Sequence, residues 1–317
     1  MEHYPLLIIL GPTASGKTRL AVQLAATLRG EVISADSRQV FRGMDIGTGK
    51  DLAEYKLEGQ SIPHHLIDIR AAGEKYDVDS FKKDFNAAFR MIKEKGVLPV
   101  LCGGTGMYIH SLLQSHSYTS VPVDTELRAR LLLKDKAELE EMLTQYPKEF
   151  TEHADRSTVK RLIRAIEIAA YLQAGGELTQ DQQEFTPYVV GLDLDVTSRR
   201  SRIAKRLDAR FASGLIEEVQ QLLSNGVSAE ILTFYGLEYK MVVSYLKQDI
   251  SLTELRERLY NGICQYAKRQ MTFFRKMEKD GVKIHWYQAD NPSSELTKKI
   301  INNLPASFIS IANATKP

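Results

Sequence analysis

Cysteine and tryptophan are scarce in this chain. Its 317 residues include two cysteines, Cys102 and Cys264, and one tryptophan. Two thiols are too few for a disulfide framework or a cysteine-rich zinc cluster. An apolar run long enough to cross a membrane is lacking, as is the charged and then apolar start of a secretory signal. The net charge of +2 indicates no particular partner. We therefore expect a cytoplasmic protein with no membrane partner.

A glycine-bracketed loop follows the first apolar run. The apolar residues Leu6 to Leu10 lead into Gly11-Pro-Thr-Ala-Ser-Gly-Lys-Thr18, which matches the G-x-x-x-x-G-K-[ST] pattern between a strand and a helix. Backbone N–H groups of such a loop cradle phosphate oxygens at the positive end of the helix. Lys17 adds a charge for the terminal phosphates, and the Thr18 hydroxyl can hold Mg²⁺. The predicted phosphate-binding residues are Gly11, Thr13, Ala14, Ser15, Gly16, Lys17 and Thr18.

Basic side chains gather in three stretches of the sequence. In a helix, Arg202, Arg206 and Arg210 would stack on one face at a spacing of four residues. Each cluster alone fits a solvated helix face with acidic neighbours, whereas three clusters beside a phosphate site favour nucleic acid or a polyphosphate. The clusters are Lys160, Arg161 and Arg164; Arg199, Arg200, Arg202, Lys205, Arg206 and Arg210; and Lys268, Arg269, Arg275, Lys276 and Lys279.

Short apolar runs alternate with helical patterns, which predicts an α/β fold: a parallel sheet like that of the phosphate-loop NTPases, flanked by helices. Residues 117–185 are charged, poor in strand signals and helical by pattern, with helices expected at 126–143 and 158–172. We interpret this stretch as an all-helical insertion domain between two parts of the core, 1–116 and 186–317, and we expect the tail from 306 to 317 to be loosely ordered. The expected core strands are 6–10, 31–36, 97–102, 188–194 and 283–287, with core helices at 18–29 and 78–95.

Ligands of open parallel sheets bind beyond the carboxyl ends of the strands. That edge would bring together the phosphate loop, Asp36 and the turn Gly103-Gly-Thr-Gly106. Asp36 can hold magnesium through water or act as a general base towards an acceptor. The glycines of the turn would permit close backbone approach to a ligand, and Thr105 would present its hydroxyl to the cleft. The neighbours His64 and His65 lack a further ligand for a transition metal, so we expect them to be structural.

Six segments in this order resemble the bacterial tRNA dimethylallyltransferases (tRNA isopentenyltransferases), and the second is the most specific. They are Gly11-Pro-Thr-Ala-Ser-Gly-Lys-Thr18, Ile33-Ser-Ala-Asp-Ser-Arg-Gln-Val-Phe-Arg-Gly-Met-Asp-Ile-Gly-Thr48, Pro63-His-His-Leu-Ile-Asp-Ile69, Gly103-Gly-Thr-Gly-Met-Tyr-Ile109, Lys160-Arg-Leu-Ile-Arg-Ala-Ile-Glu167 and Tyr266-Ala-Lys-Arg-Gln-Met-Thr-Phe-Phe-Arg275. The resemblance implies transfer of a dimethylallyl group from dimethylallyl diphosphate to N6 of the adenosine 3′ of the anticodon in tRNA, with Mg²⁺ as cofactor.

The resemblance also implies roles for individual residues. Asp36 matches the family's general base, and Thr105 matches the threonine that hydrogen-bonds the target amine. The chemistry of the reaction fits this, since Lys17 and the phosphate loop can neutralise the charge of the leaving diphosphate. Arg202 and Arg206 match a region that contributes to the diphosphate site. The helical insertion would grip the anticodon stem-loop, and we expect a monomer because the RNA surface must stay free. The residues expected to contact tRNA are Asp36, Ser37, Arg38, Gln39, Thr105, Arg128, Lys160, Arg161 and Arg164.

Four stretches depart from the family pattern. The chain has Gly47-Thr-Gly-Lys-Asp51 where Gly-Thr-Ala-Lys-Pro is usual, and Tyr235-Gly-Leu-Glu-Tyr-Lys240 where Ile-Gly-Tyr-Lys-Glu is usual. It also has Glu152-His-Ala-Asp-Arg-Ser-Thr158 in place of a Pro-Asn-Asp turn, and Thr272-Phe-Phe-Arg275 in place of Thr-Trp-Phe-Arg. These departures concern details of tRNA contact rather than the class of reaction.

Two alternatives use the same loop. One is an isopentenyltransferase that acts on AMP or ADP, and the other is a small-molecule kinase. The long basic insertion favours tRNA, because a mononucleotide needs no such grip. A GTP-dependent switch is disfavoured by the absence of an Asn-Lys-x-Asp motif.

Overall fold

The structure, a computed structural model, describes residues 3–114, 118, 121–152, 154–178, 184–290 and 293–314. The chain divides into two compact units, and each is described by itself. Met1–Leu113 and Gln183–Pro317 form the first, here called the core unit, and Gln114–Gln182 form the second, here called the helical unit. The sequence had placed this insertion over 117–185.

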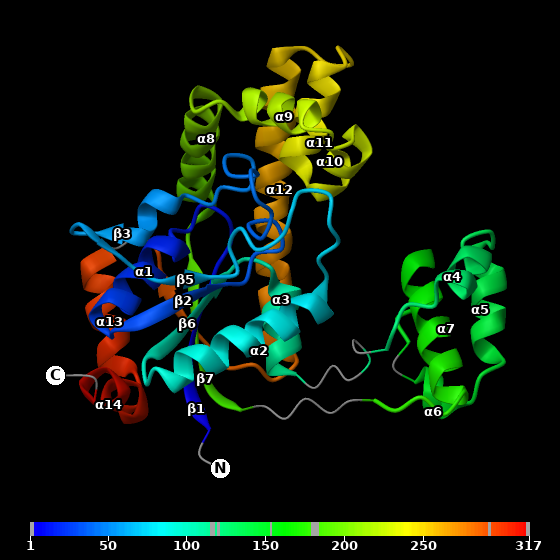
Figure 1. Cartoon of the computed structure of the whole chain (residues 1–317), viewed down its shortest axis with the longest axis horizontal. Coiled ribbons are helices and arrows are strands. Elements are labelled where there is room, and N and C mark those ends of the chain that lie inside the picture. Colours follow the sequence, from blue (N-terminus) through cyan, green and yellow to red (C-terminus); the bar gives the residue numbers. More distant parts are fainter. Residues whose placement is uncertain are drawn as a thin grey trace. The chain divides into compact units, whose positions relative to one another are not determined.

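A parallel sheet of six strands forms the centre of the core unit (Figure 1). The fold-class prediction is therefore confirmed, and the five predicted strands are present with shifts of a few residues at their ends. In the order in which they lie in the sheet, the strands are β5 (His64–His65), β2 (Gly30–Ser34), β6 (Leu98–Gly103), β1 (Tyr4–Leu10), β7 (Phe185–Asp193) and β8 (Ile284–Gln288). The edge strand β5 was missed because two residues are too few to show a pattern. A separate hairpin pairs β3 (Lys56–Leu57) with β4 (Gln60–Ser61), directly after the 3-10 helix η1 (Leu52–Tyr55).

Both faces of the sheet are covered, which explains why its strands are apolar without alternation. In β1, Leu7 and Ile9 pack into one core layer, and Leu6, Ile8 and Leu10 pack into the other. The first layer is closed by α1 (Lys17–Thr27), α13 (Ser293–Asn303) and α14 (Ala306–Ala314). The second is closed by α2 (Val78–Glu94), α3 (Gly106–Leu113) and the last third of α12 (Leu252–Lys279).

The expectation of a loosely ordered tail is wrong for residues 306–314. These residues form α14, and Phe308 lies in the core with 1% of its surface exposed. Phe308, together with the partly buried Ile309 and Ile311, thus holds this short helix onto the sheet layer.

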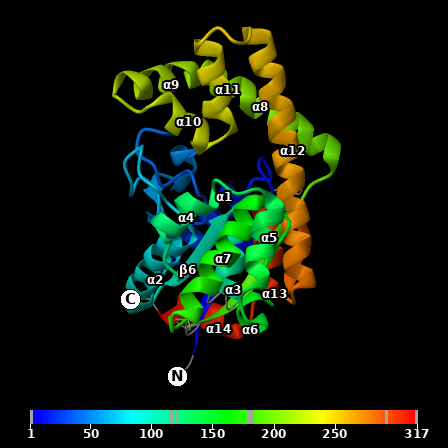
Figure 2. The same cartoon turned by 90° about the vertical axis from the view of Figure 1, so that its right-hand side faces the viewer.

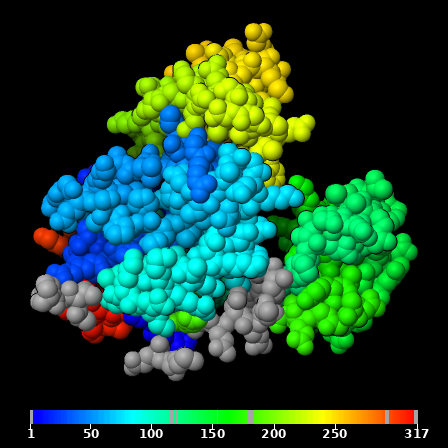
Figure 3. Space-filling view, in the orientation of Figure 1, coloured from blue at the N-terminus to red at the C-terminus, as the bar shows by residue number. Residues whose placement is uncertain are grey.

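A second group of helices stands beyond the carboxyl edge of the sheet (Figure 2). It comprises α8 (Val196–Ala212), α9 (Leu215–Ser224), α10 (Ala229–Tyr235), α11 (Leu237–Leu246) and the first half of α12. Their core includes Val40, Phe41 and Met44 from the segment that follows β2. In the space-filling view this segment, in blue, lies directly against the yellow-green helices (Figure 3). The long helix α12 therefore joins this helical group to the sheet.

In the part of the helical unit that the structure describes, four helices surround a small apolar core. Leu131, Leu139, Leu143, Leu162 and Ile166 are buried in it. The single helix expected at 126–143 is in fact two, because Asp135 and Glu138 form a capping box that starts a new helix. The helices are α4 (Thr125–Leu131), α5 (Lys136–Thr144), α6 (Lys148–Thr151) and α7 (Val159–Gln173).

Candidate active site

The phosphate loop joins the end of β1 to the start of α1. Gly16 has φ 84° and Ala14 has φ 61°, so the chain reverses through the left-handed region that turns successive N–H groups to one side. A side chain at Gly11 would lie 2.7 Å from Ser15 Oγ. That hydroxyl is buried and has no hydrogen-bond partner among the described residues. The loop thus presents polar groups that are ready for an anion, at the N-terminus of a helix.

A cavity of about 980 Å³ lies over this loop, within the core unit. Of the predicted site residues of the core unit, it is lined by Thr13, Ala14, Ser15, Gly16, Lys17, Thr18, Asp36, Ser37, Arg38, Gln39, Arg202 and Arg206. Gly11 and Thr105 lie beside lining residues. Gly11 packs against Leu192, and Thr105 Oγ1 accepts a hydrogen bond of 3.2 Å from the N–H of Ser37. The structure therefore brings the predicted residues of the core unit around one cavity.

The carboxylate of Asp36 is held in place by the backbone that follows it. Its Oδ1 accepts hydrogen bonds from the N–H groups of Arg38 at 2.9 Å and Gln39 at 3.4 Å. This local turn is typical of an aspartate at the end of a strand. Gln39 in turn accepts from the Ser34 hydroxyl at 3.0 Å and donates to the Gly49 carbonyl at 3.1 Å. The Asp36 carboxylate is therefore held in a fixed position on the cavity lining.

Two basic elements face the same cavity. Burial lowers the pKa of Lys17, and the nearby Arg206 lowers it further, while Asp36 opposes the shift. From α8, Arg202 donates to the Ala289 carbonyl at 2.9 Å, and Arg206 pairs with Asp51 and reaches Thr13 Oγ1 at 3.5 Å. Arg210 also lines the cavity, as the four-residue spacing of these arginines predicts. The cavity lining thus carries several positive charges beside the phosphate loop, as a diphosphate requires.

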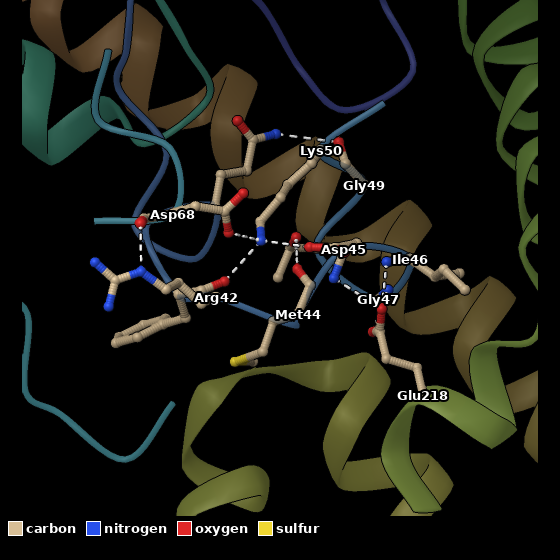
Figure 4. Close-up of polar contacts among 12 residues, drawn as sticks. Arg42, Met44, Asp45, Ile46, Gly47, Gly49, Lys50, Asp68 and Glu218 are labelled. Carbon is tan, nitrogen blue, oxygen red and sulfur yellow. Dashed lines mark hydrogen bonds and ion pairs between the residues drawn. The ribbon is translucent and has the colours of Figure 1, made fainter. Parts of the chain in front are cut away.

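The segment that carries Gly49 is anchored from two sides (Figure 4). Lys50 is 1% exposed, and its ammonium group donates to the Phe41 carbonyl and pairs with Asp45 and Asp68. On the other side Glu218, from α9, accepts the N–H groups of Asp45 at 2.7 Å, Ile46 at 2.6 Å and Gly47 at 3.0 Å. Such charge-assisted bonds fix the backbone that holds Gln39 and Arg206.

Comparison with known proteins gives the family. The IPP transferase family matches residues 39–277. A protein of Bacteroides fragilis named tRNA dimethylallyltransferase 2 is 47% identical over 93% of this chain and 96% of its own length. One of Parabacteroides distasonis, tRNA dimethylallyltransferase 1, is 45% identical over 96% of this chain and 99% of its own. The chain belongs to the IPP transferase family.

Solved structures of the IPP transferase family agree with this fold. The tRNA isopentenylpyrophosphate transferase of Bacillus halodurans superposes with a TM-score of 0.70 at 31% identity, covering 98% of each chain. That of Staphylococcus epidermidis gives 0.66 at 31% identity, covering 94% of this chain and 98% of the other. The family resemblance drawn from the sequence motifs is therefore confirmed.

Residues from two of the four stretches that depart from the IPP transferase pattern meet at one pair of arginines. A side chain at Gly49, whose φ is 63°, would overlap the guanidinium groups of Arg206 and Arg210. Asp51, with φ 47°, pairs with Arg206, and Glu238 accepts from Arg210 at 3.1 Å. A proline at position 51 would not adopt that φ. The departures are thus a coupled set in which a missing side chain makes room and two carboxylates hold the arginines.

Gln270 lines the cavity and was not among the site residues predicted from the sequence. From α12 it accepts a bond from the N–H of Thr13 at 2.8 Å and donates to the Gly104 carbonyl at 2.8 Å. It therefore ties the phosphate loop to the turn after β6. Its place inside the family segment Tyr266–Arg275 was the signal that pointed to it.

The glycines of the turn after β6 also allow close contacts between segments of the protein itself. A side chain at Gly103 would overlap the carbonyl oxygen of Ala35, and one at Gly104 would overlap the Gln270 amide. One at Gly106 would overlap the Phe273 ring. These glycines thus permit close approach of the protein's own segments at these three positions.

The predicted tRNA-binding residues of the helical unit fall into two classes. Arg128 donates to the buried Glu167 at 2.7 and 2.6 Å, and Arg164 donates to Glu167 at 3.4 Å and to the Val121 carbonyl at 2.6 Å. Lys160 and Arg161 are exposed, although Arg161 also pairs with Asp155 at 2.8 Å. Two of the four predicted contacts thus also hold the helical unit together, and contact of all four with tRNA stays a prediction.

The described residues show neither a metal-ligand cluster nor a membrane-spanning helix. His65 pairs with Glu31 at 2.7 Å, and His64 packs against the Tyr55 ring. No group of three or more His, Cys, Asp or Glu side chains that could hold a metal is found in the described ranges. Nor does any helix there combine the length and apolarity needed to span a bilayer.

Proposed function

We propose that this chain transfers the dimethylallyl group of dimethylallyl diphosphate to N6 of the adenosine 3′ of the anticodon in tRNA and releases diphosphate. The observation that carries the proposal is that a phosphate loop, arginines and a fixed aspartate line one cavity. Names of relatives support the substrate, since those 45–47% identical are called tRNA dimethylallyltransferases.

The phosphate loop and the arginines would serve the leaving group. An allylic carbon–oxygen bond breaks readily when the charge that develops on the diphosphate is neutralised. Lys17, Arg206 and the loop N–H groups supply that neutralisation, and Arg202 adds charge from the same helix. The unpartnered Ser15 hydroxyl fits this anion site.

The residues present also fit Mg²⁺. This ion prefers hard oxygen ligands and commonly takes few from the protein, with substrate phosphates and water completing its shell. Thr18, at the end of the loop, and Asp36 both line the cavity. Thr18 would hold the ion, with Asp36 available through water. When bound, Mg²⁺ would add positive charge at the leaving diphosphate.

Asp36 would serve the acceptor. As N6 of the adenine attacks the allylic carbon, the new N–C bond forms, the C–O bond to diphosphate breaks, and a proton must leave the nitrogen. Asp36 takes that proton because its carboxylate is held at the cavity wall by Arg38 and Gln39. Thr105, beside Ser37, would hydrogen-bond the amine. A base stacked in a loop cannot reach this cavity, so the adenosine must flip out.

The exposed basic residues of the helical unit, Lys160 and Arg161, would bind phosphates of the anticodon stem. We propose a monomer, since this surface must stay free for RNA.

The test is incubation of the protein with radiolabelled dimethylallyl diphosphate and Mg²⁺ in three parallel reactions, with unmodified tRNA, AMP or no acceptor. Label in tRNA that disappears in Asp36→Ala supports the proposal. Label in AMP would instead show an adenylate isopentenyltransferase. Absence of label, with the protein folded and ATP turned over, would show a kinase.

A further inference from the structure

An exposed aromatic side chain stands next to two residues that line the cavity. Phe234, the penultimate residue of α10, has 72% of its surface exposed, whereas its neighbour Tyr235 has 2% exposed and lines the cavity. Exposing a phenyl ring this far gives up most of the free energy that its burial would contribute. A single exposed apolar residue needs no explanation on its own, so its surroundings decide whether it has a role.

Those surroundings connect Phe234 to the proposed catalytic carboxylate. The Arg38 guanidinium carbon lies 5.7 Å from the centroid of the Phe234 ring and 5.7 Å from that of Tyr235. Arg38 also donates to the Phe234 carbonyl at 3.3 Å. The N–H of the same arginine bonds Asp36 at 2.9 Å. One residue therefore links the exposed ring to the point where the acceptor nitrogen would sit.

The support beneath the exposed ring is rigid. The Tyr235 hydroxyl donates to the Glu74 carbonyl at 2.8 Å and accepts from the N–H of Gly73 at 2.6 Å. The Tyr235 ring packs on the buried ring of Phe41 with centroids 4.3 Å apart. Tyr235 therefore holds the backbone at Phe234 in place, and the exposed ring does not belong to a loose loop.

We propose that Phe234 and Arg38, here called the stacking platform, stack one of the two bases that flank the target adenosine. The inference rests on the proposed function. Flipping the target base leaves its neighbours without a stacking partner, and RNA-binding proteins stack such bases on aromatic rings and guanidinium planes. The positive charge of Arg38 suits a chain of phosphates, and the platform adjoins the cavity that would hold the flipped base. An RNA loop fits both features, whereas a free mononucleotide has no flanking base to stack.

The first test compares variants of Phe234 in the full chain. Base–aromatic stacking is worth about 1–3 kcal/mol, so Phe234→Ala should lower kcat/KM for tRNA roughly 5- to 150-fold. KM for dimethylallyl diphosphate and the melting temperature should stay unchanged. Phe234→Tyr should retain activity, while Phe234→Leu, which keeps an apolar side chain without a ring, should not. Met91→Ala, which also removes an exposed apolar side chain but on α2, is the matched control and should behave like the wild type.

The second test identifies the base. Anticodon stem-loops are prepared with an abasic nucleotide on the 5′ or the 3′ side of the target adenosine and assayed with wild type and Phe234→Ala. The platform is supported if removal of one flanking base lowers the activity of the wild type but has no further effect on Phe234→Ala, because the base and the ring are then energetically coupled. Additive losses at both positions, or full activity of Phe234→Ala, would overturn it while the proposed function stands. A wild-type protein that labels no stem-loop at all would overturn the proposed function and the platform with it.

Discussion

The arginines of the cavity and those of the helical unit look alike in the sequence but differ in their acidic partners. Arg206 pairs with Asp51, whose side chain is 42% exposed, while Arg128 and Arg164 pair with Glu167, whose side chain is fully buried. An exposed carboxylate is well solvated and contributes little to stability, so an incoming anion can replace it. A buried one cannot be left without its partners. The exposure of the acidic partner, rather than the count of arginines, separates a binding site from an internal support.

Replacement of Glu167 should have the largest effect, and it tests the internal support of the helical unit. Glu167→Ala leaves two guanidinium groups without their buried partner and should destabilise the helical unit by about 3 kcal/mol. Hydrogen exchange of the full chain measures this, with faster exchange expected in α4–α7 and unchanged exchange in the sheet. The control is Glu140→Ala, which removes an exposed partner of Lys136 and should cost under about 1 kcal/mol. Unchanged protection of α7 in Glu167→Ala would contradict the structural role.

Replacement of Arg206 tests whether the cavity arginines bind the diphosphate. Hydrogen bonds to charged groups are worth about 1.5–3 kcal/mol, so Arg206→Ala should weaken inhibition by pyrophosphate roughly 10- to 100-fold. Asp51→Ala should have the opposite sign and tighten inhibition a few-fold, because it removes the carboxylate that competes for the same guanidinium. Weaker inhibition in Asp51→Ala would mean instead that Asp51 positions Arg206 for the diphosphate.

Because Lys17 is buried, we expect the affinity for dimethylallyl diphosphate to depend on pH. Its pKa is lowered by burial, so the free enzyme loses this charge at a lower pH than an ordinary lysine, whose pKa is about 10.4. Affinity for dimethylallyl diphosphate should therefore be full below the lowered pKa and fall by up to about tenfold per pH unit above it. Lys17→Arg, which stays charged, should flatten the profile. Titration of binding against pH measures both, and identical profiles for the two proteins would contradict the assignment.

Lys160 gives the smallest effect. Lys160→Ala should weaken tRNA binding a few-fold and reduce the dependence of log affinity on log salt concentration by just under 1, as expected for one lost phosphate contact. Lys247→Ala, an exposed lysine of the core unit, serves as the control. A salt slope that stays at the wild-type value would remove Lys160 from the RNA surface.

The sequence predicted the sheet and the cavity well because both depend on local signals. The apolar runs and the glycine-bracketed loop specify strands and a phosphate site without reference to distant residues. The break at Asp135 and the helix α14 were missed, since one depends on a capping box inside a helical pattern and the other on the burial of Phe308. The inward role of Arg164 depends on Glu167 and on the carbonyl of Val121, which is distant in sequence.

The contacts of the glycines after β6 likewise depend on residues that are distant in the sequence. The sequence marked Gly103 as a place of close approach, and the structure shows the Ala35 carbonyl as one group that approaches it; approach of a ligand stays a prediction. Likewise, nothing local in the sequence shows that Gln270 joins the phosphate loop to that turn. Contacts between segments far apart in the chain are what the structure adds.

The most direct test of the account is a single-turnover assay of Asp36→Asn with tRNA and dimethylallyl diphosphate, with the affinity for each substrate measured in parallel. Asparagine keeps the size of the side chain and an oxygen that can accept the bonds from Arg38 and Gln39, but it cannot take the proton. The account predicts a rate about 10²–10⁴ times lower, with both affinities within a few-fold of wild type. A near-normal rate, or a loss that lies entirely in substrate binding, would contradict the role of Asp36 as general base.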